Sequence, residues 1–337
     1  MRARTTCSIL CFIATAAAAC LETTAQAPTE ARGGSDSVGL APLTELAGTY
    51  KGESGGLYGN GRNEPPETHR AAALREAGQI RPLDREGKPS RDGRIALLAI
   101  GMSNTTQEFS AFKRMADSDS EKSPAVVLAD GAQGGQAAEE WVNDATNRGS
   151  GKRVWETVEE RLSAAGVTDA QVQAVWLKQA LIRPEQYGDF LGHARRLEED
   201  LVKILQLAKR RYPNLRVAYL SSRIYAGYAT TPLNPEPYSY ESAFAVRWVI
   251  QSQIEGKAAL NYDPKRGEVR APLVLWGPYL WADGRKARKS DGFTWERADL
   301  APGDGTHPSL SGRQKVARLL LDFFKKDPTS RSWFVAS

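Results

Sequence analysis

The chain has 337 residues, of which 41% are hydrophobic and 25% are charged, and its formal net charge is +5. This length and composition are typical of a globular protein with one large or two small domains, and they exclude a disordered or fibrous chain. The 45 basic and 40 acidic residues are interspersed along the sequence, which indicates a mixed, solvated surface and argues against a nucleic-acid partner.

The first 27 residues have the features of an export signal peptide. Two arginines, Arg2 and Arg4, precede an apolar stretch over residues 9–19 that is too short for a membrane-spanning helix. Cleavage after Ala27 would release a secreted or periplasmic protein, which is the outcome we expect. The alternative is cleavage before Cys20, which would leave a lipid-anchored protein. No integral membrane span is predicted in either case.

All three cysteines, Cys7, Cys11 and Cys20, fall within this signal segment. The exported chain is therefore predicted to contain no disulfide and no thiolate metal site. Two of the three histidines, His69 and His193, are predicted to be surface residues. Because no histidine pair stands at metal-ligand spacing, we expect neither a metal ion nor a cofactor.

Two segments of unusual composition follow the signal. Residues 28–44 are rich in Pro, Thr, Gly and Ser, so they are predicted to form a flexible linker before a single domain at residues 45–330. Residues 50–62 contain five glycines. A loop of this kind forms either a structured part of the surface or a wall of a binding site, and its composition leaves both readings open.

From residue 94 onward, short apolar runs alternate with segments of helical periodicity. Apolar runs of this length are typical of strands that are buried on both faces of a parallel sheet. The predicted strands are residues 95–100, 125–129, 172–177, 215–220 and 273–276. The predicted helices are residues 68–78, 136–146, 151–165, 189–212 and 239–256, one that begins near a Thr105–Glu108 capping box, and a last one capped by Ser311. This alternation predicts a three-layer α/β/α domain with a five-stranded, mainly parallel, doubly wound sheet.

A serine and an acid–histidine pair stand at opposite ends of this predicted domain. Ser103 follows the first strand, near the start of a helix, where backbone N–H groups favour developing negative charge. Asp304 and His307 lie three residues apart in a loop before the last helix. A histidine that is oriented by a carboxylate can activate a serine hydroxyl as a nucleophile. Because ligands bind at the carboxyl ends of parallel strands, we expect the three side chains to meet there.

The order and spacing of these blocks resemble the SGNH (GDSL-type) hydrolases over roughly residues 94–326. The resemblance implies a flavodoxin-like fold in which Ser103 is the nucleophile, His307 the general base and Asp304 the carboxylate that orients the base. One departure precedes the nucleophile, where Met102 stands in place of the usual Asp. The family's Asp is not the nucleophile, so the implied reaction does not depend on it.

The same resemblance implies an oxyanion hole. Residues 130–134 (DGAQG) resemble the second block of the family, which implies that backbone N–H groups of Gly131 and Ser103 hold the oxyanion. The third block departs from the family pattern, which has an Asn after the third strand. Gln179 stands at that place and its amide can also donate a hydrogen bond, while Lys178 is a second candidate.

Residues near the ends of later strands are weaker candidates for substrate binding. Tyr279 and Trp281 offer flat apolar faces with polar tips that suit a sugar ring, and core or loop packing is the alternative. Arg223 follows the fourth strand, where it either binds an anionic group or structures a loop. Lys178 is the remaining candidate.

The sequence therefore favours a secreted serine esterase that cleaves carboxylic esters through an acyl-enzyme. Acetyl esters on carbohydrate are the expected substrates, because export, aromatic loops and the family resemblance point the same way. The alternative is a non-catalytic protein on the same fold that binds a glycan or a surface partner. Met102 and the missing Asn favour the binding protein, whereas Ser103, Asp304 and His307 argue against it, because a binding protein has no need of all three.

Overall fold

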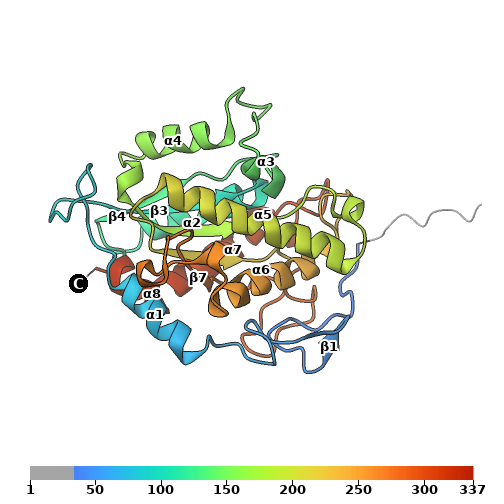
Figure 1. Cartoon of the computed structure of the whole chain (residues 1–337). Coiled ribbons are helices and arrows are strands. Elements are labelled where there is room, and N and C mark those ends of the chain that lie inside the picture. Colours follow the sequence, from blue (N-terminus) through green and yellow to red (C-terminus); the bar gives the residue numbers. More distant parts are fainter. Residues whose placement is uncertain (1–33, 337) are drawn as a thin grey trace, which may run out of the picture. The chain divides into compact units, whose positions relative to one another are not determined.

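A computed structural model describes residues 34–336 (Figure 1). The predicted signal peptide and the first part of the predicted linker lie outside the described residues. The remaining linker residues, 34–44, pack against the domain. Val38 donates its N–H to Asp283 at 2.7 Å, and the buried Leu43 donates its N–H to the hydroxyl of Tyr279 at 3.0 Å. The prediction of a flexible linker is therefore wrong for residues 34–44.

A five-stranded parallel sheet forms the centre of the fold. Its strands are β3 (Ile95–Gly101), β4 (Val126–Asp130), β5 (Val172–Lys178), β6 (Val217–Ser221) and β7 (Leu273–Trp276). They are paired in the order β4-β3-β5-β6-β7. Almost every strand residue is buried, because helices cover both faces of the sheet. The predicted fold class, a three-layer α/β/α domain with five parallel strands, is confirmed.

Helices form the two outer layers (Figure 1). One layer contains α3 (Ala138–Val142), α4 (Val154–Ala164), α5 (Phe190–Arg211) and α6 (Tyr238–Ile254). The other contains α1 (Glu67–Ala77), α2 (Ser103–Asp117), α7 (Leu310–Lys326) and α8 (Pro328–Phe334). Within these layers α5 packs against α6, and α2 against α7. Short 3₁₀ turns lie in the connections: η1 (Asp169–Gln171), η2 (Pro184–Tyr187), η3 (Ala258–Leu260), η4 (Pro264–Arg266) and η5 (Arg297–Asp299).

Helix α2 begins at Ser103, two residues before the predicted start. Thr105 and Glu108 do not form the predicted capping box, because both side chains turn towards the sheet. The Thr105 hydroxyl donates a 2.8 Å hydrogen bond to the carbonyl oxygen of Lys178, and Glu108 pairs with the amine of Lys178. Polar residues of the first turns of α2 thereby fasten that helix to the end of β5.

The strand order places the site at a change of direction in the sheet. From β3 the chain passes first to β4 on one side and then back to β5 on the other. A crevice opens at such a point, at the carboxyl ends of the strands. The segments that follow β3, β4, β5 and β6 therefore converge on one edge of the sheet.

The glycine-rich segment 50–62 is a structural part of the surface. It contains a short antiparallel pair, β1 (Thr49–Tyr50) and β2 (Glu53–Ser54), and then a loop that packs on α6. Gln251 of α6 donates a 3.1 Å hydrogen bond to the carbonyl oxygen of Tyr58. Gly59 has φ +80°, a left-handed backbone conformation that favours glycine at this turn.

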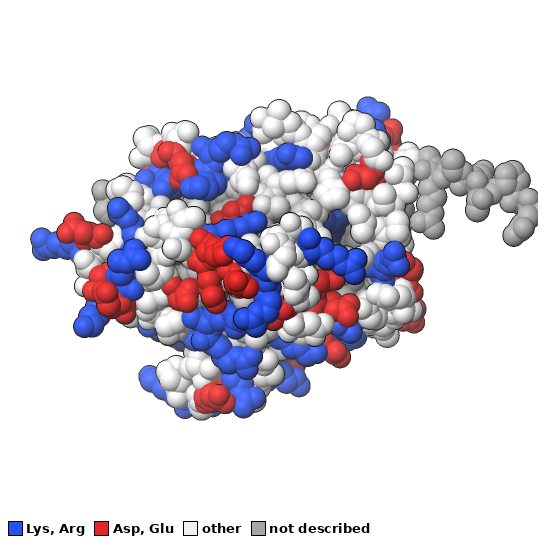
Figure 2. Space-filling model, turned by 90° about the horizontal axis from the view of Figure 1, so that it is seen from above, with Lys and Arg blue, Asp and Glu red and all other residues white. Residues whose placement is uncertain are grey.

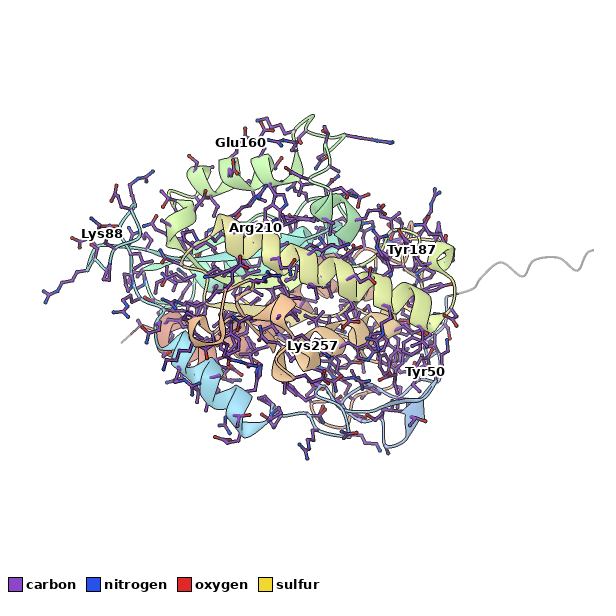
Figure 3. All side chains as sticks on the ribbon, in the orientation of Figure 1. Tyr50, Lys88, Glu160, Tyr187, Arg210 and Lys257 are labelled. Carbon is purple, nitrogen blue, oxygen red and sulfur yellow. The ribbon has the colours of Figure 1, made fainter. Side chains whose placement is uncertain are left out.

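The surface carries mixed charge. Basic and acidic side chains are interspersed over the face seen in Figure 2. Charged residues such as Lys88, Glu160, Arg210 and Lys257 lie on the outside of the fold (Figure 3). Among the helices described, none is long and apolar enough to cross a membrane.

Candidate active site

Ser103 and His307 are in hydrogen-bond contact. The Oγ atom of Ser103, the first residue of α2, lies 2.8 Å from the Nε2 atom of His307. The histidine is carried by the loop between η5 and α7, so the contact joins residues 204 positions apart. The expectation that the two residues meet at the carboxyl end of β3 agrees with this geometry.

Asp304 holds the other side of the histidine ring. Its Oδ2 atom lies 2.6 Å from Nδ1 of His307, and its Oδ1 atom accepts the N–H groups of Thr306 at 2.8 Å and His307 at 3.0 Å. Burial raises the pKa of Asp304, but these N–H groups and the imidazole lower it by more. The net pKa of the carboxyl therefore lies below its ordinary value. Asp304 is thus an ionised partner for the ring at neutral pH.

The loop that carries His307 is braced from two sides. Gly305 has φ +61°, and a Cβ there would lie 1.8 Å from the carbonyl oxygen of Tyr228, so only glycine fits this turn. The N–H of Thr230 donates to the carbonyl oxygen of Asp304 at 2.9 Å. On the other side, Asn104 donates to the carbonyl oxygen of Thr306 at 3.0 Å. These contacts fix the imidazole relative to the serine.

A cavity of about 180 Å³ opens beside the serine and the histidine. Its wall is mainly apolar, and the apolar residues are Met102, Ala137, Ala180, Leu181, Ile182 and Leu233. Besides Ser103 and His307, the polar residues that line it are Asn104, Gln136, Arg223, Asn234 and Thr306. The small volume suits a short acyl group, and the apolar part of the wall suits its hydrocarbon atoms.

The glycine that lines the cavity is Gly135 rather than Gly131, the glycine that the family resemblance gives as an oxyanion donor. Gly131 does not line the cavity, because it packs against β3, where a Cβ would lie 2.8 Å from the carbonyl oxygen of Ala99. Gly135 and Gln136 line the cavity instead. Within residues 34–336, no hydrogen bond is made by the backbone N–H of Gly135. The turn at residues 134–136 therefore lines the cavity, whereas the role of Gly131 as a donor stays a prediction.

The two remaining donor candidates lie in different environments. Ser103 is the first residue of α2, and the first N–H groups of a helix have no partner within the helix. Its backbone N–H is therefore free for an oxyanion. The Gln179 side chain is buried after β5, and neither of its amide atoms finds a partner among the described residues. Gln179 stays a predicted donor, although Ala180 and Leu181 rather than Gln179 form the cavity wall.

Lys178 is not a substrate-binding residue. Its side chain is completely buried, and its Nζ atom lies 2.6 Å from Oε1 of Glu108. Burial lowers the pKa of Lys178 to about 8 and raises the pKa of Glu108, while the attraction between the two charges opposes both shifts. The pair joins α2 to β5 beneath the cavity, so its role is structural.

The prediction that Tyr279 and Trp281 bind substrate is also wrong, because both residues belong to the core. The hydroxyl of Tyr279 accepts the N–H of Leu43, and the indole N–H of Trp281 donates to Glu236 at 2.7 Å. Neither residue lines the cavity. Core packing, the alternative left open by the sequence, is what the fold selects.

The histidines outside the site are buried rather than exposed. Nε2 of His69 lies 2.9 Å from the carbonyl oxygen of Val274, and Nε2 of His193 lies 2.6 Å from Oε2 of Glu241. The prediction that both are surface residues is wrong, since each has a polar partner in the interior. Across residues 34–336, no group of three or more His, Cys, Asp or Glu side chains is arranged to hold a metal ion.

Sequence reasoning missed Gln136 and Asn234 on the cavity wall. Asn234 has φ +58° and precedes a proline in a loop after β6. An Asn-Pro pair is a turn signal, and turns at the carboxyl ends of strands carry ligand-binding residues in this kind of sheet. Gln136 follows a Gly-Gly pair after β4, which is also a turn signal at the carboxyl end of a strand.

No protein-family model and no curated protein matches this sequence. Several solved structures resemble it at low similarity. Protein YxiM from Bacillus subtilis is 12% identical, with a TM-score of 0.37, and the match covers 71% of this chain and 58% of that protein. A Bacteroides fragilis protein named as a proposed acylhydrolase is 13% identical, with a TM-score of 0.36, and the match covers 77% of this chain and 97% of that protein.

A third solved structure is the C-terminal catalytic domain of peptidoglycan O-acetyltransferase A from Streptococcus pneumoniae. It is 12% identical, with a TM-score of 0.35, and the match covers 72% of this chain and 98% of that domain. The printed names of these neighbours include an acylhydrolase and an acyltransferase. Likenesses of this size carry no argument about function, which has to come from the geometry of the site.

Proposed function

We propose that this protein is a serine hydrolase of the SGNH type that cleaves carboxylic esters. The observation that carries the proposal is the chain of two hydrogen bonds, 2.8 Å from Ser103 to His307 and 2.6 Å from His307 to Asp304. Serine, imidazole and carboxylate in this order form the arrangement that activates a hydroxyl group for acyl transfer.

In the proposed reaction, Oγ of Ser103 attacks the ester carbonyl carbon while Nε2 of His307 takes the hydroxyl proton. The carboxylate of Asp304 stabilises the imidazolium that forms. As the tetrahedral intermediate collapses, the alcohol leaves with the proton from His307 and an acyl-enzyme remains on Ser103. Water then attacks the acyl-enzyme and gives its proton to His307. Collapse of the second intermediate releases the acid, and the proton returns to Ser103.

The oxyanion is assigned to donors at the start of α2 and in the turn after β4. The N–H of Ser103 lies at the positive end of the α2 dipole, which favours developing negative charge. The second donor is assigned to the turn at residues 134–136, and the amide of Gln179 is the third. Removal of one such donor typically lowers kcat by about 10²–10³-fold.

The cavity favours a short acyl group, and the alcohol part has more room. A second cavity of about 560 Å³ shares Gly135, Gln136 and Ile182 with the first and extends along residues 145–149. A bulky alcohol, such as a sugar unit, would fit this second cavity. The aromatic residues that supported a carbohydrate ester lie in the core, so that expectation now depends on the second cavity and on the predicted export.

The rival hypothesis of a non-catalytic glycan-binding protein receives less support. A binding protein has no need of a serine, a histidine and an acid in hydrogen-bond register. The aromatic side chains that would have held a glycan are also absent from the wall of the cavity. Release of 4-nitrophenol from 4-nitrophenyl acetate distinguishes the two hypotheses.

We expect wild-type protein to turn over this ester and Ser103→Ala to fall to the background rate. Ser118→Ala, an exposed serine just after α2, is the matched control and should keep full activity. A serine-directed fluorophosphonate should modify Ser103, as mass spectrometry of the tryptic peptides would show. Equal rates for wild type and Ser103→Ala, together with no phosphonate on Ser103, would reject the hydrolase proposal.

A further inference from the structure

Arg223 is a buried cation on the cavity wall whose guanidinium makes no hydrogen bond to residues 34–336. It follows β6, its side chain is only 2% exposed, and it lines the same cavity as Ser103 and His307. Its Nε and Nη2 atoms make no hydrogen bond to any described residue. Burial lowers the pKa of Arg223, while Glu108, Glu236 and Asp304 attract the charge and oppose that shift.

The acidic residues near Arg223 are engaged elsewhere. Glu108 pairs with the amine of Lys178, and Asp304 binds the ring of His307. Glu236 accepts hydrogen bonds from the indole of Trp281 at 2.7 Å and from the N–H of Ala226 at 2.9 Å. These carboxylates therefore attract the guanidinium through space, but none of them accepts a hydrogen bond from it.

A second buried arginine shows what a structural role looks like in this protein. Arg288 is also almost fully buried, but its Nε donates to Asp291 at 3.0 Å and its Nη1 donates to the carbonyl oxygen of Tyr279 at 2.6 Å. Arg288, which has a structural role, therefore has hydrogen-bond acceptors for its guanidinium. Burial of a charge without acceptors is costly. We therefore expect a ligand to supply the hydrogen-bond acceptor for Arg223.

The surroundings of Arg223 narrow the chemistry of that ligand. The guanidinium is a planar fork that matches the two oxygens of a carboxylate. On the same wall, Oε1 of Gln136 and Oδ1 of Asn234 are buried and also without partners among the described residues. These two acceptors suit hydroxyl or amide hydrogens of a ligand rather than its negative charge. Apart from the catalytic candidates, and from Asn104 and Thr306, the rest of the wall is apolar.

We propose that Arg223 binds a carboxylate of the substrate, so that the preferred substrates are esters that carry a free carboxylate group. This inference rests on the proposed esterase function and specifies its substrate class. The carboxylate can belong to the acyl part, as in a half-ester of a dicarboxylic acid, or to the alcohol part, as in an acetylated uronic acid. In both cases the substrate carboxylate supplies the hydrogen-bond acceptor that the Arg223 guanidinium lacks among the described residues.

Two matched pairs of esters test the proposal and distinguish the two sources of the carboxylate. The first pair is the 4-nitrophenyl monoester of succinic acid and 4-nitrophenyl butyrate. The second is an O-acetylated methyl glucuronoside and the corresponding acetylated methyl glucoside. We expect kcat/KM for the anionic member of one pair to exceed that of its neutral partner by about 10- to 100-fold, as a charged hydrogen bond provides.

Arg223→Met should reduce this ratio to near one, and Arg223→Lys should restore part of it. Arg288→Met, at the arginine outside the cavity, should keep the wild-type ratio. The proposal is overturned if neither pair shows a preference for the carboxylate, or if the preference survives in Arg223→Met. It is also overturned if Arg223→Met slows both members equally, because Arg223 would then act on the oxyanion.

A binding measurement separates this inference from the proposed function. Ser103→Ala protein should bind succinate or glucuronate in a calorimetric titration, and Ser103→Ala/Arg223→Met should show at least about tenfold weaker binding. Binding through Arg223 in a protein whose wild type shows no esterase activity would reject the proposed function and retain the anion site. Esterase activity without binding of either carboxylate would reject the anion site alone.

Discussion

Asn104 Nδ2 donates a 3.0 Å hydrogen bond to the main-chain oxygen of Thr306, so the residue after Ser103 holds the residue before His307. Both groups are buried, and the contact joins positions 202 residues apart in the sequence. The position of His307 relative to Ser103 therefore depends on the Asn104 amide as well as on the hydrogen bond between Ser103 and His307.

Removal of this amide should impair the reaction more than binding. We expect Asn104→Ala to lower kcat by about 10- to 100-fold with little change in KM, because a small displacement of the base from the serine is costly. Steady-state kinetics on 4-nitrophenyl acetate and the rate of fluorophosphonate labelling at Ser103 measure this. Asn214→Ala is the matched control, since its amide donates to the carbonyl oxygen of Ala170 at 2.8 Å, in contact with no residue of the site. An equal loss of kcat in both variants would contradict a positioning role for Asn104.

The buried pair of Lys178 and Glu108 should stabilise the fold only as a pair. Removal of one partner leaves an uncompensated charge, so Lys178→Met and Glu108→Leu should each lower the free energy of unfolding by about 3–5 kcal/mol. Lys178→Met/Glu108→Leu should recover most of that loss, because apolar side chains suit this interior. Urea unfolding of the four proteins gives the coupling energy. Additive losses in the double variant would show that the two charges do not depend on each other.

The fold could be predicted because its signals are local. Continuous apolar runs such as Ile95–Ile100 and Val172–Leu177 mark strands that are buried on both faces, whatever their neighbours. The acid–histidine pair could be placed for a similar reason, since Asp304 and His307 lie in one turn and Ser103 at the end of a recognisable strand. These assignments need no knowledge of long-range packing.

The errors concern side-chain direction, which depends on distant contacts. Tyr279 was expected at the site, yet its hydroxyl meets the N–H of Leu43, 236 residues away. Lys178 was expected to face a substrate, but its partner Glu108 is 70 residues away. Gly131 was expected at the oxyanion hole, but it packs closely against β3, and Gly135 lines the cavity. A glycine in the sequence can indicate close packing as well as a ligand-binding turn. No local pattern separates these cases.

The carboxylate of Asp304 should affect both activity and the pH dependence of stability. Asp304→Asn should lower kcat by about 10³–10⁴-fold, because the ring loses the group that fixes its tautomer and stabilises its charged form. Asp322→Asn, at an exposed aspartate of α7, should leave kcat unchanged. Hydrolysis of 4-nitrophenyl acetate at neutral pH measures both variants.

The same substitution predicts a change at acid pH. The pKa of Asp304 is lower in the folded state than its unfolded value of about 3.9. Its contribution to stability is therefore complete above that unfolded value and is lost as the pH falls through the folded-state pKa. The Tm difference between wild type and Asp304→Asn should be largest near pH 7 and should shrink below about pH 4. A difference that stays constant down to pH 2 would contradict this assignment.

Arg223 should lower the stability of the ligand-free protein while it provides a binding site for the substrate carboxylate. Its guanidinium is buried and finds no acceptor in the described part of the chain. Replacement by a side chain of similar length and no charge therefore removes a desolvation cost and keeps the packing. We expect Arg223→Met to raise the free energy of unfolding by about 1–3 kcal/mol in the absence of ligand. Arg288→Met should lower it, because Asp291 and the carbonyl oxygen of Tyr279 then lose their donor. Urea unfolding of both variants measures these changes in the free energy of unfolding, which should have opposite signs. A loss of stability in Arg223→Met as large as in Arg288→Met would show that Arg223 has a structural role.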